Sequence, residues 1–373
     1  MNLEIREVVS SSELRTFIFL PKKIHRHDHA WLPPLWSDEK VLFNKEKNHS
    51  FEFADTVMLM AWRGGKAVGR IMGLISHRYN KINNENSGRF CFLECDNDRE
   101  VVLELITAVE EWARKKGMSA LVGPLGFSDK DPQGFQIEGF DLPQIMTTTT
   151  NLPYLPELIA DEGYVKKKDI LNYHAPIPDH LPELYTKIFA RVSQRQSLKI
   201  IEFKTKNEIK PYIVDVLELM NETFAEIYGF VPLTKEEKIE FANRYLPLID
   251  PEFIKVVSNG SGELVGFAIG MPDLSPGIKR SRGYLFPIGI FHILRSAATS
   301  KKLMMMLGGV KAGYRGQGID TLMGAKILES AKRKNMTILD SHLVLEENQP
   351  MRSEYERIGG KIVKRFRIFT KDL

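Results

Sequence analysis

The sequence predicts a mixed α/β protein built from two tandem copies of one domain, each a mostly antiparallel sheet flanked by helices. Three observations support this fold class. The chain of 373 residues is long enough for two domains. Short motifs recur in the same order in its two halves. Both halves also alternate apolar runs typical of strands with amphipathic segments typical of helices.

The internal repeat consists of three motifs. The first and third recur 197 residues later, and the second recurs 218 residues later. The second half therefore gains 21 residues after its first motif and loses them again before its third. Three ordered matches with one compensated shift indicate duplication of one fold. The matched segments are 68–73 with 265–270, 113–118 with 331–336, and 151–153 with 348–350.

In the first half, alternating apolar residues predict strands, and one clear stripe predicts a helix. The turn Arg63-Gly-Gly-Lys66 joins two of the strands. Apolar residues from Val102 to Ala113 repeat at helical spacing. Another helix follows Pro153, and the threonine run 147–150 is expected in a strand or at a strand edge. The expected strands are 3–8, 56–62, 67–75, 89–94, 120–122 and 164–175.

The second half repeats this order. Between the halves, 176–198 reads as an ordered linker with a helix at 181–194. We therefore expect a first domain at 1–175 and a second at 199–373. The expected elements are strands at 199–203, 253–257, 263–270, 303–310, 341–345 and from 361, a helical region at 210–243, and helices at 319–334 and 350–358.

Composition narrows the class of protein. Hydrophobic residues make up 43% and charged residues 27%, which is typical of a soluble globular protein. The net charge of +4 comes without a long basic run, so we expect no nucleic-acid partner. Cys91 and Cys95 indicate reduced thiols, and no secretion signal or membrane span is visible, so we expect a cytoplasmic protein. The histidines within 25–29 have no second ligand motif, so we expect an exposed loop and no metal site.

The segment most informative about chemistry runs from Leu307 to Ile319, between an apolar strand and an amphipathic helix. A glycine-bearing turn at this place lets several backbone N–H groups converge at a helix N-terminus, which suits a phosphate. Gly316 and Gly318 lack side chains that would block close approach, and Arg315 adds a cation at the rim. A tight turn without any ligand is the alternative.

A second segment follows the next strand. It contains a polar asparagine, a short helix with Tyr355, and a glycine stop at Gly359. Together the two segments resemble the GNAT superfamily of acyl-CoA N-acyltransferases, and the element order of both halves fits that fold. The whole chain is also similar to a bacterial group of tandem GNAT-like proteins. The segments that carry this wider similarity are 31–34, 139–141 and 272–274.

The resemblance implies roles for particular residues. The strand ending at Gly309 and Val310 would pair with the pantetheine arm of CoA, with the thioester oxygen near the N–H of about Val310. Asn348 matches the family's pantetheine-contacting asparagine, and Tyr355 matches the tyrosine that protonates the leaving thiolate. The family pattern Arg/Gln-x-x-Gly-x-Gly/Ala binds the CoA pyrophosphate through backbone amides. Here that pattern is formed by Arg315, Gly316, Gln317, Gly318, Ile319 and Asp320.

Two features depart from the family pattern. Asp320 stands where the family has Gly or Ala; it suits the helix dipole but would repel a pyrophosphate by about 1 kcal/mol. The first half has lost the donor equipment. At the repeat spacings the two turn glycines correspond to Asp98 and Glu100, and the tyrosine corresponds to Leu158. We therefore expect a degenerate first domain and CoA binding by the second domain only.

The sequence thus predicts an N-acyltransferase that uses acetyl-CoA or another acyl-CoA and a small-molecule or peptide amine as acceptor. One alternative is another donor on this fold, such as aminoacyl-tRNA, which the small net charge disfavours. The other is a non-catalytic ligand-binding or interaction protein. No general base is identified, because the candidate carboxylates are expected at the surface. These candidates are Glu222, Glu226, Glu346 and Glu347.

The insertion in the second half carries a strongly apolar stretch at 283–294. It holds too many large apolar residues for a free loop, so we expect a mostly buried lid over the acceptor cleft or against the first domain. A dimer patch or a contact with a membrane surface are the alternatives.

Overall fold

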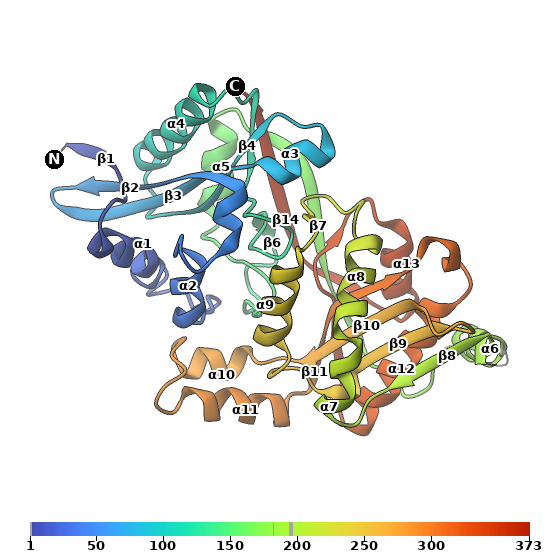
Figure 1. Ribbon diagram of the computed structural model, residues 1–373. Coiled ribbons are helices and arrows are strands. Elements are labelled where there is room, and N and C mark those ends of the chain that lie inside the picture. Colours follow the sequence, from blue (N-terminus) through green and yellow to red (C-terminus); the bar gives the residue numbers. More distant parts are fainter. Residues whose placement is uncertain (1, 182, 194–196) are drawn as a thin grey trace.

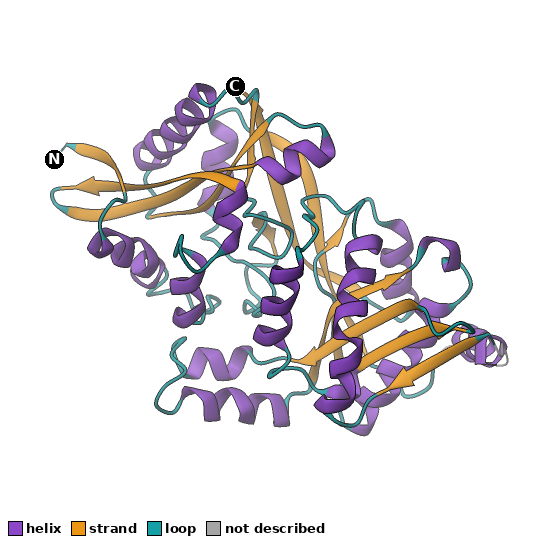
Figure 2. Cartoon of the chain, viewed as in Figure 1, coloured by secondary structure: helices purple, strands orange, loops and turns teal. Residues whose placement is uncertain are grey.

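The computed structural model describes residues 2–181, 183–193 and 197–373 (Figure 1). In this part of the chain, 14 strands form one continuous sheet with helices packed on it (Figure 2). The sheet is mostly antiparallel, and its parallel neighbours are one pair of strands in each half. The chain is therefore mixed α/β with a mostly antiparallel sheet, as predicted.

The first half contributes seven strands and five helices to the described structure. The strands are β1 (Leu3–Glu7), β2 (Ala54–Arg63), β3 (Lys66–Ser76), β4 (Ser87–Cys95), β5 (Ala120–Gly123), β6 (Phe135–Glu138) and β7 (Val165–Pro176). The helices are α1 (Ser11–Ile24), α2 (Trp36–Leu42), α3 (His77–Asn83), α4 (Arg99–Lys115) and α5 (Tyr154–Asp161), with a short 3-10 helix, η1 (His49–Phe53).

The linker contains α6 (Glu183–Ser193), inside the predicted helix 181–194, of which Pro182 and Gln194 lie outside the described residues. The second half follows. Its strands are β8 (Leu198–Glu202), β9 (Ile254–Asn259), β10 (Leu264–Pro272), β11 (Lys302–Val310), β12 (Ile338–Asp340), β13 (Val344–Leu345) and β14 (Lys361–Asp372). Its helices are α7 (Lys206–Ile209), α8 (Ile213–Thr223), α9 (Lys235–Tyr245), α10 (Ser275–Arg280), α11 (Gly289–Thr299), α12 (Ile319–Arg333) and α13 (Gln349–Arg357).

The last strand of each half pairs with the sheet of the other half. The strand order across the join is β5-β14-β7-β12, so β14 lies beside β5 of the first half and β7 beside β12 of the second (Figure 1). β7 and β14 also pair with each other, antiparallel. Each half therefore needs a strand from the other half to complete its sheet. The sequence predicts both strands but not their exchange, because pairing partners are set by tertiary contacts.

The repeat is visible in how the halves pack. A Cβ atom on Gly69 would lie 2.6 Å from Val101 Cγ1, so α4 sits directly on β3. A Cβ atom on Gly266 would lie 2.8 Å from Ile319 Cγ2, so α12 sits on β10 in the same way. These glycines and their partners keep the spacings of 197 and 218 residues found in the sequence. One helix-on-sheet contact is thus built twice with the same residue types.

The predicted strand at 341–345 is displaced in the structure. β12 ends at Asp340, and 344–345 form β13 against β7. The interruption has a local cause, because the Ser341 hydroxyl accepts a hydrogen bond from Tyr173 N at 2.8 Å. A side-chain acceptor thus takes the place of a backbone partner in the ladder.

The threonine run 147–150 is not a strand, so that prediction is wrong. Thr148 Oγ1 donates to Ile145 O at 3.2 Å, and Thr150 Oγ1 donates to Gln136 Oε1 at 3.0 Å. Hydroxyl groups that bond to nearby acceptors favour turns over extended pairing.

The apolar insertion forms α10 and α11, which pack side by side at one edge of the molecule (Figure 1). The prediction of a mostly buried lid is wrong, because Phe286 is 81% exposed and Phe291 is 67% exposed. None of the helices that the structure describes is both long and apolar enough to cross a membrane.

Candidate active site

The predicted phosphate turn has the local geometry that the sequence suggests. β11 ends at Val310, a single 3-10 turn covers Ala312–Tyr314, and α12 begins at Ile319. Gly316 and Gly318 have φ angles of 71° and 83°, in the left-handed region that favours glycine. A Cβ atom on Gly316 would meet no atom within 4 Å, so the turn is open on that side.

Polar side chains hold this turn in place. Arg315 Nε donates to Val310 O at 3.2 Å, and Gln317 Nε2 donates to Gly313 O at 3.0 Å. The Arg315 guanidinium also lies 3.9 Å from a carboxylate oxygen of Glu226. Half of the Arg315 side chain is exposed, and an ion pair this exposed contributes little stability. The guanidinium is therefore placed at the rim, where an anion can compete for it.

β11 has one open backbone edge along the strand predicted to pair with pantetheine. On one side it pairs with β10 as far as Val310. On the other side its ladder with β12 runs only from Lys302 to Met304. Within the described chain, no strand covers that side of β11 from Met305 onward. An open edge offers N–H and C=O groups with which an extended ligand containing amides can pair.

Gly309 has a packing reason to be glycine. A Cβ atom there would lie 2.4 Å from Thr223 Oγ1 and 3.0 Å from Phe267 Cε1. α8 therefore approaches β11 closely only because residue 309 has no side chain. The donor contacts predicted for Gly309 and Val310 use backbone groups and are compatible with this packing.

Tyr355 lies on α13 in the apolar core between α12 and the sheet. Its side chain is 8% exposed and stacks on Tyr173, with ring centroids 5.5 Å apart. The same core contains Met305 and Val310 of β11 and Ile319 of α12. Burial raises the pKa of the Tyr355 phenol, and the charge of Asp340 adds to this effect. The phenol is therefore protonated at neutral pH, as a proton donor must be.

Asn348 caps α13, and Asp320 lies in the first turn of α12, whose N-cap residue is Gly318. Asn348 Oδ1 accepts from Met351 N at 3.2 Å at the start of α13. Asp320 Oδ1 accepts from Thr321 N at 2.8 Å in the first turn of α12. Both residues are exposed. Asp320 thus adds a negative charge at the helix end where the predicted anion site lies, while Asn348 stands at the solvent-facing end of α13.

The linker helix α6 borders the phosphate turn, which the sequence did not predict. A Cβ atom on Gly318 would lie 2.5 Å from Ile188 Cγ2 of α6. Val192 is fully buried, and the Tyr185 hydroxyl donates to Glu354 of α13. α6 therefore reaches from the start of α12 to α13. The apolar spacing of 185, 188, 189 and 192 was the available signal, since it marks one face of a helix.

A polar cluster lies where the β11–β12 ladder ends. Asp340 is fully buried, accepts from Asn172 Nδ2 at 2.7 Å, and lies 2.7 Å from His174 Nε2. Lys302 Nζ is 3.3 Å from Asp340 Oδ2. Burial beside this cluster lowers the pKa of Lys364 to about 8. The cluster draws on four strands, β7, β11, β12 and β14, so no sequence motif could reveal it.

His174 in this cluster has the features of a general base. Its side chain is 26% exposed, so one side of the ring is accessible, and a buried carboxylate holds Nε2. Its carboxylate partner, Asp340, is the ladder partner of Met304, immediately before the open edge of β11 begins. A carboxylate that orients an imidazole is a recurring arrangement in proton transfer.

The prediction of an exposed loop at 25–29 is wrong for His25, whereas His27 and His29 are exposed. His25 is 2% exposed, stacks on Trp31, and lies 2.9 Å from Glu94 and 3.2 Å from Asp28. Burial alone would lower the pKa of the imidazole, but the two carboxylates overcome this and raise it to about 9. His25 is therefore a buried cation that links α1 to β4.

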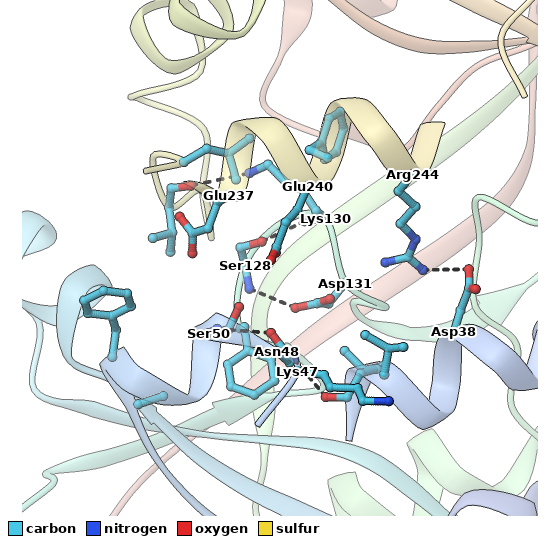
Figure 3. A pocket seen from close by; sticks show the side chains of 18 of the residues that line it. Asp38, Lys47, Asn48, Ser50, Ser128, Lys130, Asp131, Glu237, Glu240 and Arg244 are labelled. Carbon is cyan, nitrogen blue, oxygen red and sulfur yellow. Dashed lines mark hydrogen bonds and ion pairs between the residues drawn. The ribbon is translucent and has the colours of Figure 1, made fainter. Parts of the chain in front are cut away.

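A cavity of 490 Å³ lies between the two halves, where α2, η1 and 127–131 face α9 (Figure 3). Ion pairs cross it: Arg244 contacts Asp38 at 2.9 Å, and Arg78 contacts Glu237 at 3.0 Å. Asp131 points into it, and burial raises the pKa of its carboxyl group. None of the residues predicted for donor binding lines this cavity.

Comparison with known proteins agrees with the fold described above. No protein-family model matches the chain. It is 24% identical over 379 residues to a bacterial ceramide synthase of Caulobacter vibrioides, covering 100% of this chain and 98% of that protein. It is 25% identical to protein YghO of Escherichia coli K12, covering 99% and 95%. Among solved structures, a tandem GNAT protein from the clavulanic acid biosynthesis pathway superposes with a TM-score of 0.56, at 14% identity, over 100% of this chain and 98% of that one. The chain therefore has the fold of tandem GNAT proteins, which confirms the resemblance seen in its sequence.

Proposed function

We propose that the protein is an N-acyltransferase that transfers an acyl group from acyl-CoA to an amine and binds the donor in its C-terminal copy. One observation carries the proposal: the open edge of β11 leads directly into an open, glycine-bearing turn at the start of α12. A ligand with an amide-containing arm and a pyrophosphate has matching partners in both places. The two relatives also align over almost their whole length with this chain.

The residues present fit this donor. Backbone groups of Gly309 and Val310 would hold the pantetheine arm, and Asn348 would contact it from α13. The pyrophosphate would approach the turn at Gly316, which is exposed, with Arg315 at the rim and Gln317 bracing the turn. Gly318 and Ile319 are buried, so their amides would contribute through the positive end of the α12 dipole. A thioester supplies an acyl carbon that is activated toward amines. Tyr355, buried and protonated, would give its proton to the departing sulfur.

The acceptor amine must lose a proton, and we assign this step to His174. Asp340 fixes the imidazole at 2.7 Å, and Lys302 stabilises the carboxylate from 3.3 Å. Replacing His174 by Gln keeps a polar side chain but removes the base. We expect a lower kcat with an altered pH profile and an unchanged affinity for CoA. A merely structural role would change the stability but leave the shape of the pH profile intact.

The acceptor class follows from chemistry and from one relative. A ceramide is an amide of a fatty acid and a long-chain amino alcohol, and the relative from Caulobacter vibrioides is named a ceramide synthase. The cluster that carries Met304 of β11 is strongly apolar and includes Met271, Ile145 and Leu32. These side chains are buried in a packed core, so the acceptor class rests on the name of the relative. We therefore propose a long-chain primary amine.

Calorimetry with CoA tests the donor site. Gly316 is the best position, because its side-chain direction is empty and Asn or Asp tolerates a positive φ. The variants G316N and G316D differ only in charge. We expect G316D to bind CoA about tenfold more weakly than G316N, since a carboxylate near a pyrophosphate costs on the order of 1 kcal/mol. Equal affinities would place the donor elsewhere, and a folded wild-type chain that binds no CoA would favour the non-catalytic alternative.

A further inference from the structure

The hairpin of α10 and α11 carries an apolar patch that faces solvent. Two other apolar side chains of the insertion, Leu285 and Ile290, are half-buried, and Ile293 is buried. The apolar patch comprises Tyr284, Phe286, Ile288, Phe291 and Leu294, with exposed fractions of 42%, 81%, 61%, 67% and 53%. Large apolar side chains so close together and so exposed indicate a surface that is covered by something else.

The hairpin is firmly attached to the rest of the molecule. Trp36 Nε1 donates to Arg282 O at 2.8 Å, and Trp36 N donates to Gly283 O at 3.1 Å. On the inner side, Ile278 and Ile293 pack in one core with residues of both halves. The patch is thus presented by a fixed element, and its exposure is not the result of a loose loop.

The charge around the patch has one sign. From Leu274 to Lys302 the sequence contains six Lys or Arg residues and no Asp or Glu. Five of these cations are exposed, and within the described chain none of the five forms an ion pair with a carboxylate. Lys22 of α1 adds a sixth cation, 5.6 Å from the Tyr284 ring. The five exposed cations of the hairpin are Lys279, Arg280, Arg282, Arg295 and Lys301.

We infer that the hairpin of α10 and α11 docks on an anionic lipid bilayer, with the apolar patch inserted at the boundary between headgroups and acyl chains. The patch is formed by the connection between α10 and α11 and by the first turns of α11, and the exposed cations around it have no carboxylate partner within the described chain. Such an exposed apolar surface flanked by cations suits the boundary between headgroups and acyl chains. Each cation near an anionic surface adds about 1 kcal/mol of attraction at low ionic strength. A second copy of the chain is a poorer occupant, because pairing two such patches would bring their cations together.

Docking in this way goes beyond the proposed function, but it would serve it. The core beneath the hairpin also contains Met304 and Met306 of β11, the strand proposed to hold the donor. Apolar side chains thus connect the docked surface to the reacting strand. A long-chain acceptor dissolved in the bilayer would reach β11 from the side of the hairpin. This route for the acceptor rests on the proposed function, whereas docking on the bilayer does not.

Vesicle co-sedimentation tests the inference with the full chain. The probes are vesicles of phosphatidylcholine alone and of phosphatidylcholine mixed with phosphatidylglycerol. We expect strong binding only to the mixed vesicles, and a loss of at least about tenfold in partitioning for the double variant F286S/F291S. The matched control is V214S/I239S, which removes two exposed apolar side chains from α8 and α9 and should bind like the wild type.

Further measurements distinguish a lipid bilayer from a second copy of the chain as the partner of the apolar patch. A charge variant, R280Q/R282Q, should weaken binding to the mixed vesicles and reduce its dependence on salt, since two of the six cations are removed. Equal sedimentation of F286S/F291S and the wild type would overturn the inference. The inference would also be overturned if the wild type formed a dimer in analytical ultracentrifugation, F286S/F291S did not, and neither protein bound vesicles. CoA calorimetry on the same variants should be unchanged, so failure of docking leaves the proposed donor site untouched.

Discussion

The two copies share one fold but differ in what pairs with the backbone edge of their fourth strand. In the first copy, Leu125 N donates to Phe90 O at 2.9 Å, and the Tyr154 hydroxyl donates to Cys95 O at 2.6 Å. The protein's own chain thus occupies both ends of the β4 edge. In the second copy, no strand of the described chain pairs with the equivalent edge of β11 beyond Met304.

The helix ends differ in the same sense. At the start of α4, Arg63 contacts Asp98 and Glu100 and closes the turn with ion pairs. At the start of α12, two glycines are in left-handed conformations; Gly316 is exposed, and Gly318 is buried against α6. The two helix starts thus differ in a few side chains and not in architecture. Substitutions in the first copy should therefore change stability, and substitutions in the second copy should change chemistry.

The largest effect should come from removing the Tyr355 hydroxyl. Y355F keeps the stacking on Tyr173 but has no proton to give, so we expect kcat to fall by about 100-fold or more with CoA affinity retained. Its matched control in the first copy is Y154F, which loses the bond to Cys95 O. Y154F should cost about 1 kcal/mol in urea unfolding and leave kcat unchanged. If both variants have wild-type rates, the proposed proton donor is wrong.

His25 gives the largest expected stability effect in the first copy. Its pKa is about 9 in the folded chain, above the ordinary value of 6.5, so the folded state holds the proton more tightly. The stabilisation is complete below pH 6.5 and is lost as pH rises through 9. We expect the contribution of His25 to the free energy of unfolding to fall by about 2–3 kcal/mol across that window. Lys364 offsets part of this fall in the whole chain, because its pKa, lowered to about 8, makes stability rise as pH increases above that value.

Urea unfolding at pH 6 and at pH 9.5 measures this loss. H25N should be less stable than the wild type at pH 6, and this difference should largely disappear at pH 9.5, because Lys364 titrates alike in both chains. H27N, which changes an exposed neighbour, should behave like the wild type. A difference between the wild type and H25N that is the same at both pH values would show that His25 is neutral in the folded state.

A single substitution should cover the open edge of β11 by giving the second copy the tyrosine that the first copy has at Tyr154. Met351 stands 197 residues after Tyr154 and is 38% exposed. In M351Y a tyrosine would be placed to reach the end of β11 as Tyr154 reaches the end of β4. We expect CoA to bind about tenfold more weakly than to M351L, which keeps the apolar volume without a ring or hydroxyl. Equal CoA affinities of M351Y and M351L would mean that a tyrosine hydroxyl such as that of Tyr154 does not decide whether the strand edge can take a ligand.

Local sequence signals found the elements and the turn. The helical stripe at 102–113, the strand before Val310, and the glycines at 316 and 318 each follow from the spacing of nearby residues, and the structure has them. These features depend on backbone preference and periodicity, which a single segment carries. The family resemblance added the expected order of elements in both halves, and the comparison with a tandem GNAT structure confirms that fold.

The features that the sequence missed all depend on contacts between distant segments. The exchange of β7 and β14 requires knowing which strands meet. The cluster of Asp340 and His174 joins residues 166 positions apart, and α6 reaches the turn at Gly318 across the linker. The exposed patch on α11 was missed for a different reason. Apolar composition predicts burial in general, but it does not tell a core from a surface that binds a partner.

The smallest expected effect concerns Asp320, where the second copy departs from the family pattern. The carboxylate is exposed and accepts from Thr321 N, so it occupies one donor of the helix end and adds a negative charge there. In D320G that N–H becomes free and the repulsion is removed. We expect CoA to bind up to about tenfold more tightly, since about 1 kcal/mol of repulsion is worth nearly that much. The variant should lose some stability, because a carboxylate is removed from the positive end of the helix dipole. D320N separates the two contributions, since it keeps a side-chain acceptor without the charge. If D320G binds CoA more weakly than the wild type while D320N does not, the carboxylate oxygen serves to order the turn, and its charge has little effect on the donor.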